Sequence, residues 1–188
     1  MLHVTGESLM QVFLALSRAI DWVAHKLALI ATCLVLISCF VSAGNAAIRY
    51  AFNISSNAWL EIQVYMLAGM VLLGSPYVMV VNEHIRVDLL YGSVKDRTRL
   101  WIDLFGAIFF MMPICLLLVY FTWPFFYDSW KSQEVSSNAG GLIQWPVKLL
   151  LPVGFGLLAL QGISEIIKNI AALRGIQEMK FKYQAPLQ

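Results

Sequence analysis

Charged side chains are scarce in this 188-residue chain. Asp, Glu, Lys and Arg make up 13% of the residues, whereas a soluble domain carries about 25%. The polar stretches are short loops, so we expect no separate soluble domain. The three cysteines, Cys33, Cys39 and Cys115, lie inside apolar runs without metal-ligand spacing. We expect them to pack as small hydrophobic side chains.

Motifs that carry chemistry are also missing. The sequence contains no HExxH, no GxSxG and no phosphate-binding glycine loop, which argues against the common hydrolase and nucleotide-binding classes. The densest group of ionisable residues is the stretch 83–88, where the adjacent Glu83 and His84 would point apart on a helix. We therefore predict a loop anchor or a subunit contact there. We predict no metal site, no cofactor and no enzyme activity.

Long apolar runs, in contrast, fill most of the chain, of which 60% is hydrophobic. A helix that rises about 1.5 Å per residue needs roughly 20 apolar residues to cross a bilayer core. Four runs free of charged residues cover 27–48, 62–82, 104–127 and 149–164. We predict an all-α integral membrane protein in which residues 1–188 form one domain with four transmembrane helices. The predicted spans are about 27–48, 59–82, 101–127 and 146–168, followed by a cytoplasmic tail at 169–188.

Positive charge is distributed unevenly between the loops. If both termini and the loop between the second and third spans share one side, that side holds ten of the 13 Lys and Arg residues. The other side holds Arg49, Lys131 and Lys148. The positive-inside rule then predicts that both termini are cytoplasmic. The tryptophans lie near the ends of the runs, where their rings favour the headgroup zone.

Residues 7–26 repeat apolar side chains at steps of three or four, with polar residues on the other face. They form either an amphipathic helix on the cytoplasmic membrane surface or a straight extension of the first span. The loop between the second and third spans alternates apolar and charged residues, so we expect it in the interface. We expect Asn57 to cap the second span, Pro76 and Pro113 to kink their spans, and the loop 128–146 to be partly irregular.

No Asp, Glu, Lys, Arg or His lies in the middle of a predicted span. Ionisable groups deep in the membrane usually mark a transport pathway, so we do not expect this chain alone to hold a complete transport site. Arg49 and Glu61 occupy facing ends of the first two spans, and we expect a salt bridge between them or a contact with a partner protein. Small residues on three helices either pack the four helices together or receive helices of another subunit.

Three stretches of the chain resemble the DctQ-like small membrane subunit of tripartite ATP-independent periplasmic (TRAP) transporters. The first stretch, 49–65, contains Arg49, Trp59 and Glu61. The second is Gly74 followed by 82–90, with His84, Arg86 and Asp88. The third comprises 132–134, 138–146, 151–154 and 160–162, with Trp145 followed by Pro146. Its Asn-Ala-Gly-Gly and Trp-Pro sequences resemble the subgroup labelled for mannitol or chloroaromatic compounds.

The resemblance implies a division of labour between three proteins. A periplasmic binding protein captures an organic acid, and a separate large membrane subunit moves it with the energy of an ion gradient, expected to be sodium. The small subunit is then a non-catalytic scaffold in the bacterial inner membrane. Its implied partners are the large subunit, the binding protein and membrane lipids, without nucleic acid.

Only structural roles carry over from the resemblance to individual residues. They are Arg49 and Glu61 at the outer end and His84, Arg86 and Asp88 at the inner elbow, with Trp59 and Trp145 as further candidate contacts. The alternative is a small self-sufficient transporter or channel that works as a homo-oligomer. The missing mid-membrane carboxylate argues against this alternative.

Overall fold

A computed structural model describes residues 2–53, 56–82, 94–138 and 140–176, with the side chains of the first helix described from Met10 onward. The described chain is all-α apart from one isolated β-bridge. Its elements are α1 (Leu2–Phe52), α2 (Asn57–Val81), α4 (Asp96–Gly106), the π-helical η1 (Ala107–Met111), α5 (Met112–Ser132) and α6 (Trp145–Leu173). Four helical stretches are long and apolar enough to span a membrane, with α4, η1 and α5 forming one of them. The predicted fold class and the number of spans are confirmed at this level.

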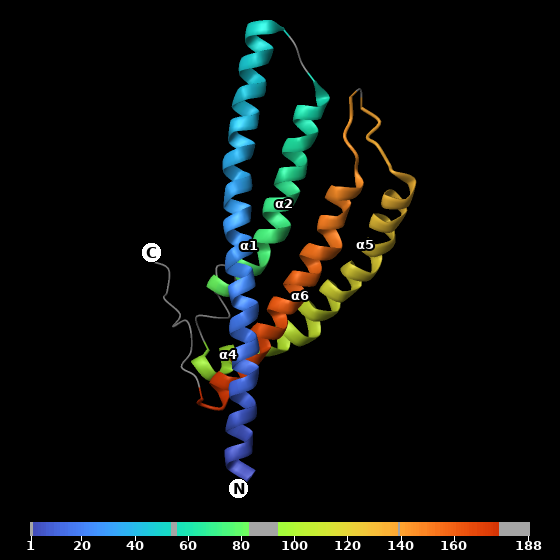
Figure 1. The fold of residues 1–188 in the computed structure, drawn as a ribbon. Helices are drawn as coiled ribbons and strands as arrows, with labels where there is room; N and C mark the ends of the chain where they lie inside the picture. The colour runs from blue at the N-terminus through green and yellow to red at the C-terminus, as the bar shows by residue number, and fades with distance from the viewer. Residues whose placement is uncertain (1, 54–55, 83–93, 139, 177–188) are drawn as a thin grey trace.

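The first helix is continuous from the N-terminal segment into the first apolar run. It has 51 residues and therefore measures about 76 Å at 1.5 Å per residue. That length is more than twice the roughly 30 Å of a bilayer core. Of the two interpretations of residues 7–26, the structure shows the straight extension, because no break separates them from the apolar run (Figure 1).

The helices form an open layer instead of a closed bundle. Helix α2 packs between α1 and α6, α1 also contacts α6, and α5 packs on α6 (Figure 1). Glycines allow the neighbouring helices to approach one another closely. A Cβ atom at Gly154 would lie 2.7 Å from Leu72 Cβ, one at Gly69 would lie 3.0 Å from Leu34 Cδ1, and one at Gly162 would collide with Met111. These three glycines therefore pack the helices of this chain together. For them, the sequence had left open whether they pack these helices or receive helices of another subunit.

A π-helical turn precedes Pro113. The N–H of Met112 bonds to the carbonyl of Ala107, five residues back. Proline lacks an N–H and its ring clashes with the carbonyl four residues earlier, so a widened turn before it relieves the clash. A π turn thus lies between α4 and α5 just before Pro113, whereas α2 continues through Pro76. The two kinks stay predictions.

One local prediction was wrong. The cap of α2 is Ser56, whose hydroxyl accepts the N–H of Ala58 at 3.3 Å, and Asn57 is already the first helical residue. The described part of the loop between α5 and α6 is irregular, as predicted, apart from one antiparallel bridge between Val135 and Ile143 that gives it the form of a short hairpin. Residues 134–138 and 140–144 are called the α5–α6 hairpin below.

Candidate functional site

Polar side chains gather at the two ends of the helix layer. The hairpin cluster joins the start of α2 to the α5–α6 hairpin and consists of Glu61, Tyr65, Ser136, Asn138 and the N–H of Leu142. The α1–α6 cluster joins the N-terminal half of α1 to the C-terminal half of α6. It consists of Ser17, Asp21, Gln161, Ser164, Glu165 and Lys168.

Glu61 is the centre of the hairpin cluster. Its Oε1 atom accepts hydrogen bonds from the Ser136 hydroxyl and from the Asn138 side-chain amide, the latter at 2.7 Å. Its Oε2 atom accepts the backbone N–H of Leu142 at 2.7 Å. One carboxylate in the first turns of α2 thus binds three donors from a single loop about 80 residues later in the chain. Hydrogen bonds to an ionised acceptor are about twice as strong as neutral ones.

The hairpin has further attachments to α2 and α6. The Tyr65 hydroxyl, one turn along α2 from Glu61, donates to the carbonyl of Ile143 at 3.3 Å. The Lys148 ammonium in α6 pairs with Glu134 at the base of the hairpin. The same ammonium lies 4.2 Å from the centre of the Phe125 ring in α5. The hairpin is therefore fixed from both sides, and its shape does not depend on its own bridge alone.

The ion pair at the base of the hairpin predicts how the hairpin responds to pH. The ammonium of Lys148 holds the pKa of Glu134 below its usual range. The ion pair therefore stabilises the hairpin fully at any pH above about 4.3, the pKa of an unperturbed glutamate. This stabilisation is lost only when the pH falls through the lowered pKa of Glu134 in the folded protein. We expect a spin label at Ser137 to keep the same mobility from about pH 5 to 8. Glu134→Gln should show higher mobility already at pH 7, and a change in the native hairpin between pH 6 and 8 would contradict the assignment.

Arg49 does not pair with Glu61. None of the ion pairs among the described residues joins the two side chains, and the carboxylate binds the hairpin instead. Arg49 lies exposed in the last turn of α1, where a cation suits the helix dipole. The predicted salt bridge was wrong because the hairpin brings three closer donors to Glu61. A contact of Arg49 with a partner protein stays a prediction.

Charge changes at these two positions should therefore differ in effect. Glu61→Lys should lower the thermal unfolding midpoint by several degrees, because it leaves three hairpin donors without their acceptor. Arg49→Glu should change the midpoint little, and the double swap should not restore it. Recovery of the midpoint in the double swap, measured in detergent by intrinsic fluorescence, would revive the direct pair.

The remaining predicted contacts lie at the same end of the layer or outside the described residues. Trp59 is 46% exposed in the first turn of α2, and Trp145 begins α6 just after the hairpin. Trp59 is therefore close to Glu61 in the sequence, and Trp145 directly follows the hairpin that binds Glu61. The predicted inner contacts lie outside the described residues: His84, Arg86 and Asp88, with most of the predicted interfacial loop.

The α1–α6 cluster is the larger polar group, and the sequence did not predict it. The Lys168 ammonium lies 3.0 Å from Asp21 Oδ1 and also pairs with Glu165. The side chain of Lys168 is 10% exposed and each carboxylate is 19% exposed, so the three charges are largely withdrawn from solvent. Asp21 Oδ1 also accepts hydrogen bonds from Gln161 at 2.8 Å and from Ser164 at 2.9 Å.

Serine hydroxyls complete this contact between the helices. Ser17 and Ser164 share a hydrogen bond of 2.7 Å, and both side chains are buried. Gln161 is fully buried, and its Oε1 atom has no hydrogen-bond partner among the described residues. A buried acceptor of this kind usually binds an ordered water molecule. The cluster thus fixes α1 against α6 through directional bonds between otherwise apolar helices.

The sequence does contain a signal for this cluster. Gln161, Ser164, Glu165 and Lys168 recur at steps of three, one and three, which places them on one face of α6. Ser17 and Asp21 recur at a step of four on α1. A polar stripe on an otherwise apolar helix requires polar partners, but the sequence alone does not say which helix provides them.

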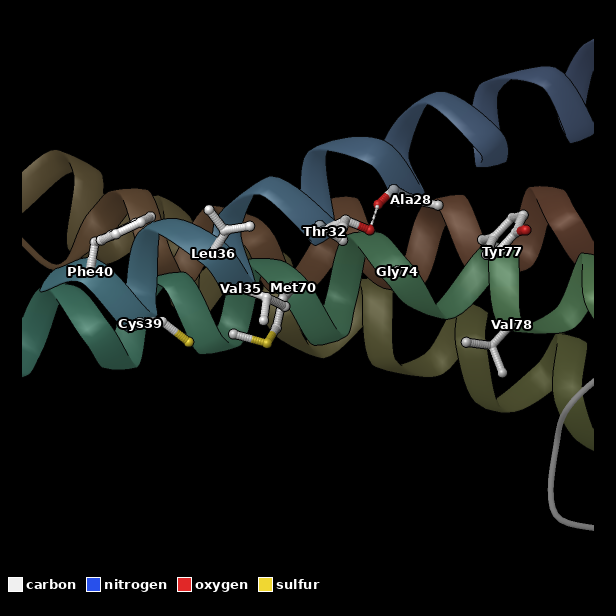
Figure 2. A pocket seen from close by; sticks show the side chains of 11 residues that line it. Ala28, Thr32, Val35, Leu36, Cys39, Phe40, Met70, Gly74, Tyr77 and Val78 are labelled. Carbon is white, nitrogen blue, oxygen red and sulfur yellow. Dashed lines mark hydrogen bonds between the residues drawn. The ribbon is translucent and has the colours of Figure 1, made fainter. Parts of the chain in front are cut away.

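An apolar groove of about 620 Å³ lies between α1 and α2, in the part of the layer between the two clusters (Figure 2). Ala28, Ala31 and Gly74 are among the small residues that line it, beside the larger Phe40 and Met70. The Thr32 hydroxyl donates to the carbonyl of Ala28 at 2.9 Å within its own helix. The Thr32 hydroxyl is therefore satisfied within α1, and most of the groove lining is apolar.

The geometry defines a class of protein: a multi-pass membrane protein in which the described polar groups serve to fix its own helices and hairpin. The comparison with known families agrees and goes further. A family model described as "Tripartite ATP-independent periplasmic transporters, DctQ component" matches residues 38–172. The chain therefore belongs to the DctQ family and is a small membrane component of a TRAP transporter, a non-catalytic part of a transport system. No curated protein and no solved structure matches the chain.

Proposed function

We propose that this chain is a scaffold that holds the immobile part of a separate large membrane subunit in place while that subunit moves the solute. The observation that carries the proposal is the lack of Asp, Glu, Lys, Arg and His in 27–48, 62–82, 104–127 and 149–164. Ionisable groups at that depth usually mark a transport pathway, and these runs contain none. A scaffold requires only exposed apolar surface against which a larger membrane protein can pack.

The open layer provides such surface on both of its faces. In the most apolar part of the four spans, the share of residues that are buried ranges from 6% in α1 to 33% in α6. The groove between α1 and α2 adds a concave apolar surface with small residues, of the kind into which a neighbouring transmembrane helix packs. These features support contact with a larger membrane protein over a wide area.

The remaining details rest on the family and on the charge distribution. We propose that the transporter imports organic acids that a periplasmic binding protein delivers, and that a sodium gradient drives it. The residues at 138–146 support the subgroup labelled for mannitol or chloroaromatic compounds, although this label does not define the substrate. The uneven positive charge supports an inner-membrane location with both termini in the cytoplasm, which places the hairpin on the periplasmic side.

Co-purification tests the scaffold role. The chain is expressed together with the large membrane subunit of its TRAP transporter, and the complex is isolated through an affinity tag on the large subunit. We expect the two proteins to elute together in a fixed ratio after size exclusion in detergent. A large subunit that is stable and monodisperse alone, without retaining this chain, would contradict the proposal.

A further inference from the structure

The apolar groove between α1 and α2 is about as long as one leaflet of a bilayer. Its wall on α1 runs from Ala28 to Phe40, which is about 18 Å at 1.5 Å per residue. One leaflet of the bilayer core measures about 15 Å. The groove follows the helices, with Phe40 at one end and Tyr77 and Val78 at the other (Figure 2). The end at Ala28 and Tyr77 is called the inner end below.

The volume of the groove favours a thin occupant. A helix about 10 Å in diameter and about 18 Å long takes up about 1,400 Å³, more than twice the 620 Å³ of the groove. A neighbouring helix that packs over α1 and α2 can therefore insert single side chains, but its body does not fit. An extended acyl chain is thinner and flexible, and it can follow a wall of small and branched apolar side chains.

Polar and aromatic side chains stand at the inner end of the groove. His25 and Lys26 are exposed and lie within one turn of Ala28. The His25 ring lies 4.9 Å from the ring of Tyr77, edge to face, and Tyr77 lines the groove. The Lys26 ammonium lies 5.6 Å from the centre of the Trp22 ring. Donors for an anionic group are thus placed where the apolar wall ends.

The positive charge at this end of α1 is not neutralised within the described chain. Neither Lys26 nor the exposed Arg18, about 12 Å earlier on the helix, forms an ion pair with another described residue. The acidic residue between them in the sequence, Asp21, pairs with Lys168 of α6. Basic residues at the cytoplasmic surface attract anionic lipids, and basic pockets between transmembrane helices bind their head groups.

We propose that the groove holds one anionic phospholipid, with an acyl chain between α1 and α2 and the phosphate near Lys26 and His25. Arg18 adds attraction from further along the same helix. This binding site belongs to the chain itself and goes beyond the proposed scaffold role. Only the assignment of the lipid to the inner leaflet rests on the proposed orientation, with both termini in the cytoplasm.

Native mass spectrometry of the purified full-length chain in detergent tests the proposal. The chain is mixed with increasing amounts of phosphatidylglycerol or of phosphatidylcholine with the same acyl chains. We expect one phosphatidylglycerol to bind about tenfold more tightly than phosphatidylcholine, because each basic residue near the head group contributes up to about fivefold. Lys26→Gln should weaken phosphatidylglycerol binding about fivefold and change phosphatidylcholine binding less than about twofold.

The matched control for the head group is Lys131→Gln, which removes an exposed cation from the last turn of α5 at the opposite end of the layer. It should leave both lipids unaffected.

A second pair of variants tests the acyl chain. Thr32 is exposed and lines the groove, so Thr32→Trp fills the groove without forcing α1 and α2 apart. We expect it to weaken the binding of both lipids about tenfold. Cys33→Trp is the control, because Cys33 is exposed on the same helix but does not line the groove. It should bind both lipids as the native chain does, and monodisperse elution of each variant shows that it is folded.

Three outcomes would overturn the inference. Equal affinity of the native chain for the two lipids would remove the head-group site, and equal effects of Lys26→Gln and Lys131→Gln would reduce it to general surface attraction. Unchanged lipid binding in Thr32→Trp, combined with loss of co-purification with the large subunit, would show that a helix of that subunit occupies the groove instead. Failure of the native chain to co-purify would contradict the proposed function and leave the lipid site untouched.

Discussion

Replacing Lys168 with methionine should lower the free energy of unfolding by about 3 kcal/mol. The substitution leaves Asp21 and Glu165 side by side at the contact between α1 and α6 without the ammonium that now pairs with both. Both carboxylates are only 19% exposed, so solvent screens their repulsion weakly. Removal of one partner from a buried ion pair costs more than the pair contributes, since it leaves uncompensated charge.

The effect can be measured by reversible unfolding in mixed micelles of increasing SDS content. Lys26→Met is the matched control, because Lys26 is exposed and its ammonium lies 5.6 Å from the centre of the Trp22 ring, with no ion pair to another described residue. It should cost less than about 1 kcal/mol. Adding Asp21→Asn to Lys168→Met should recover part of the loss, because only one carboxylate then lacks its cation. An equal loss in Lys26→Met and Lys168→Met would show that the cluster does not fix the helices.

Replacing Gly154 with alanine should have the second largest effect, a loss of about 2 kcal/mol from overpacking. The added Cβ would lie 2.7 Å from Leu72 Cβ and 3.2 Å from the Leu72 carbonyl oxygen. A backbone oxygen cannot rotate away as the end of a long side chain can. Helices α2 and α6 would therefore have to separate, and the layer would lose its closest contact between them.

Gly156 provides the control for this substitution in the same helix. A Cβ atom there would meet nothing within 4 Å among the described residues, and alanine favours a helix over glycine by up to about 1 kcal/mol. Gly156→Ala should thus be neutral or stabilising under the same unfolding conditions. If both alanine variants unfold at the same SDS content, close packing at Gly154 is not what holds α2 against α6.

The main architecture was predictable because it depends on local properties of the sequence. Four apolar runs of sufficient length specify four spanning helices, since a backbone in lipid must satisfy its own hydrogen bonds. The N-terminal segment was ambiguous because its periodicity suits both a surface helix and a longer first helix. The continuous α1 shows that helical propensity across residues 20–30 was not interrupted by any breaker.

The two polar clusters were not predictable because they depend on contacts between distant residues. Glu61 meets Ser136 and Asn138 only once α2 and the hairpin lie side by side. Before that arrangement is known, the nearest opposite charge in the sequence is Arg49, which made a salt bridge the natural prediction. In the same way, the polar stripe around Gln161 predicts that α6 has a polar partner but does not identify α1.

The clusters and the apolar surface have different roles in the proposed account. The α1–α6 cluster and the glycine contacts give the layer a fixed shape, and the hairpin cluster fixes the loop between α5 and α6. The faces of the layer remain apolar and broad, as a scaffold for a larger membrane protein requires. None of these features would move a solute across the membrane.

The central claim is that this chain supports transport without forming the pathway, and reconstituted uptake tests it most directly. Proteoliposomes are prepared with this chain alone, with the large subunit alone, and with both, each supplied with solute-loaded binding protein and an inward sodium gradient. We predict uptake with both proteins, none with this chain alone, and a large loss with the large subunit alone. Uptake by this chain alone, or full-rate uptake by the large subunit without it, would contradict the claim.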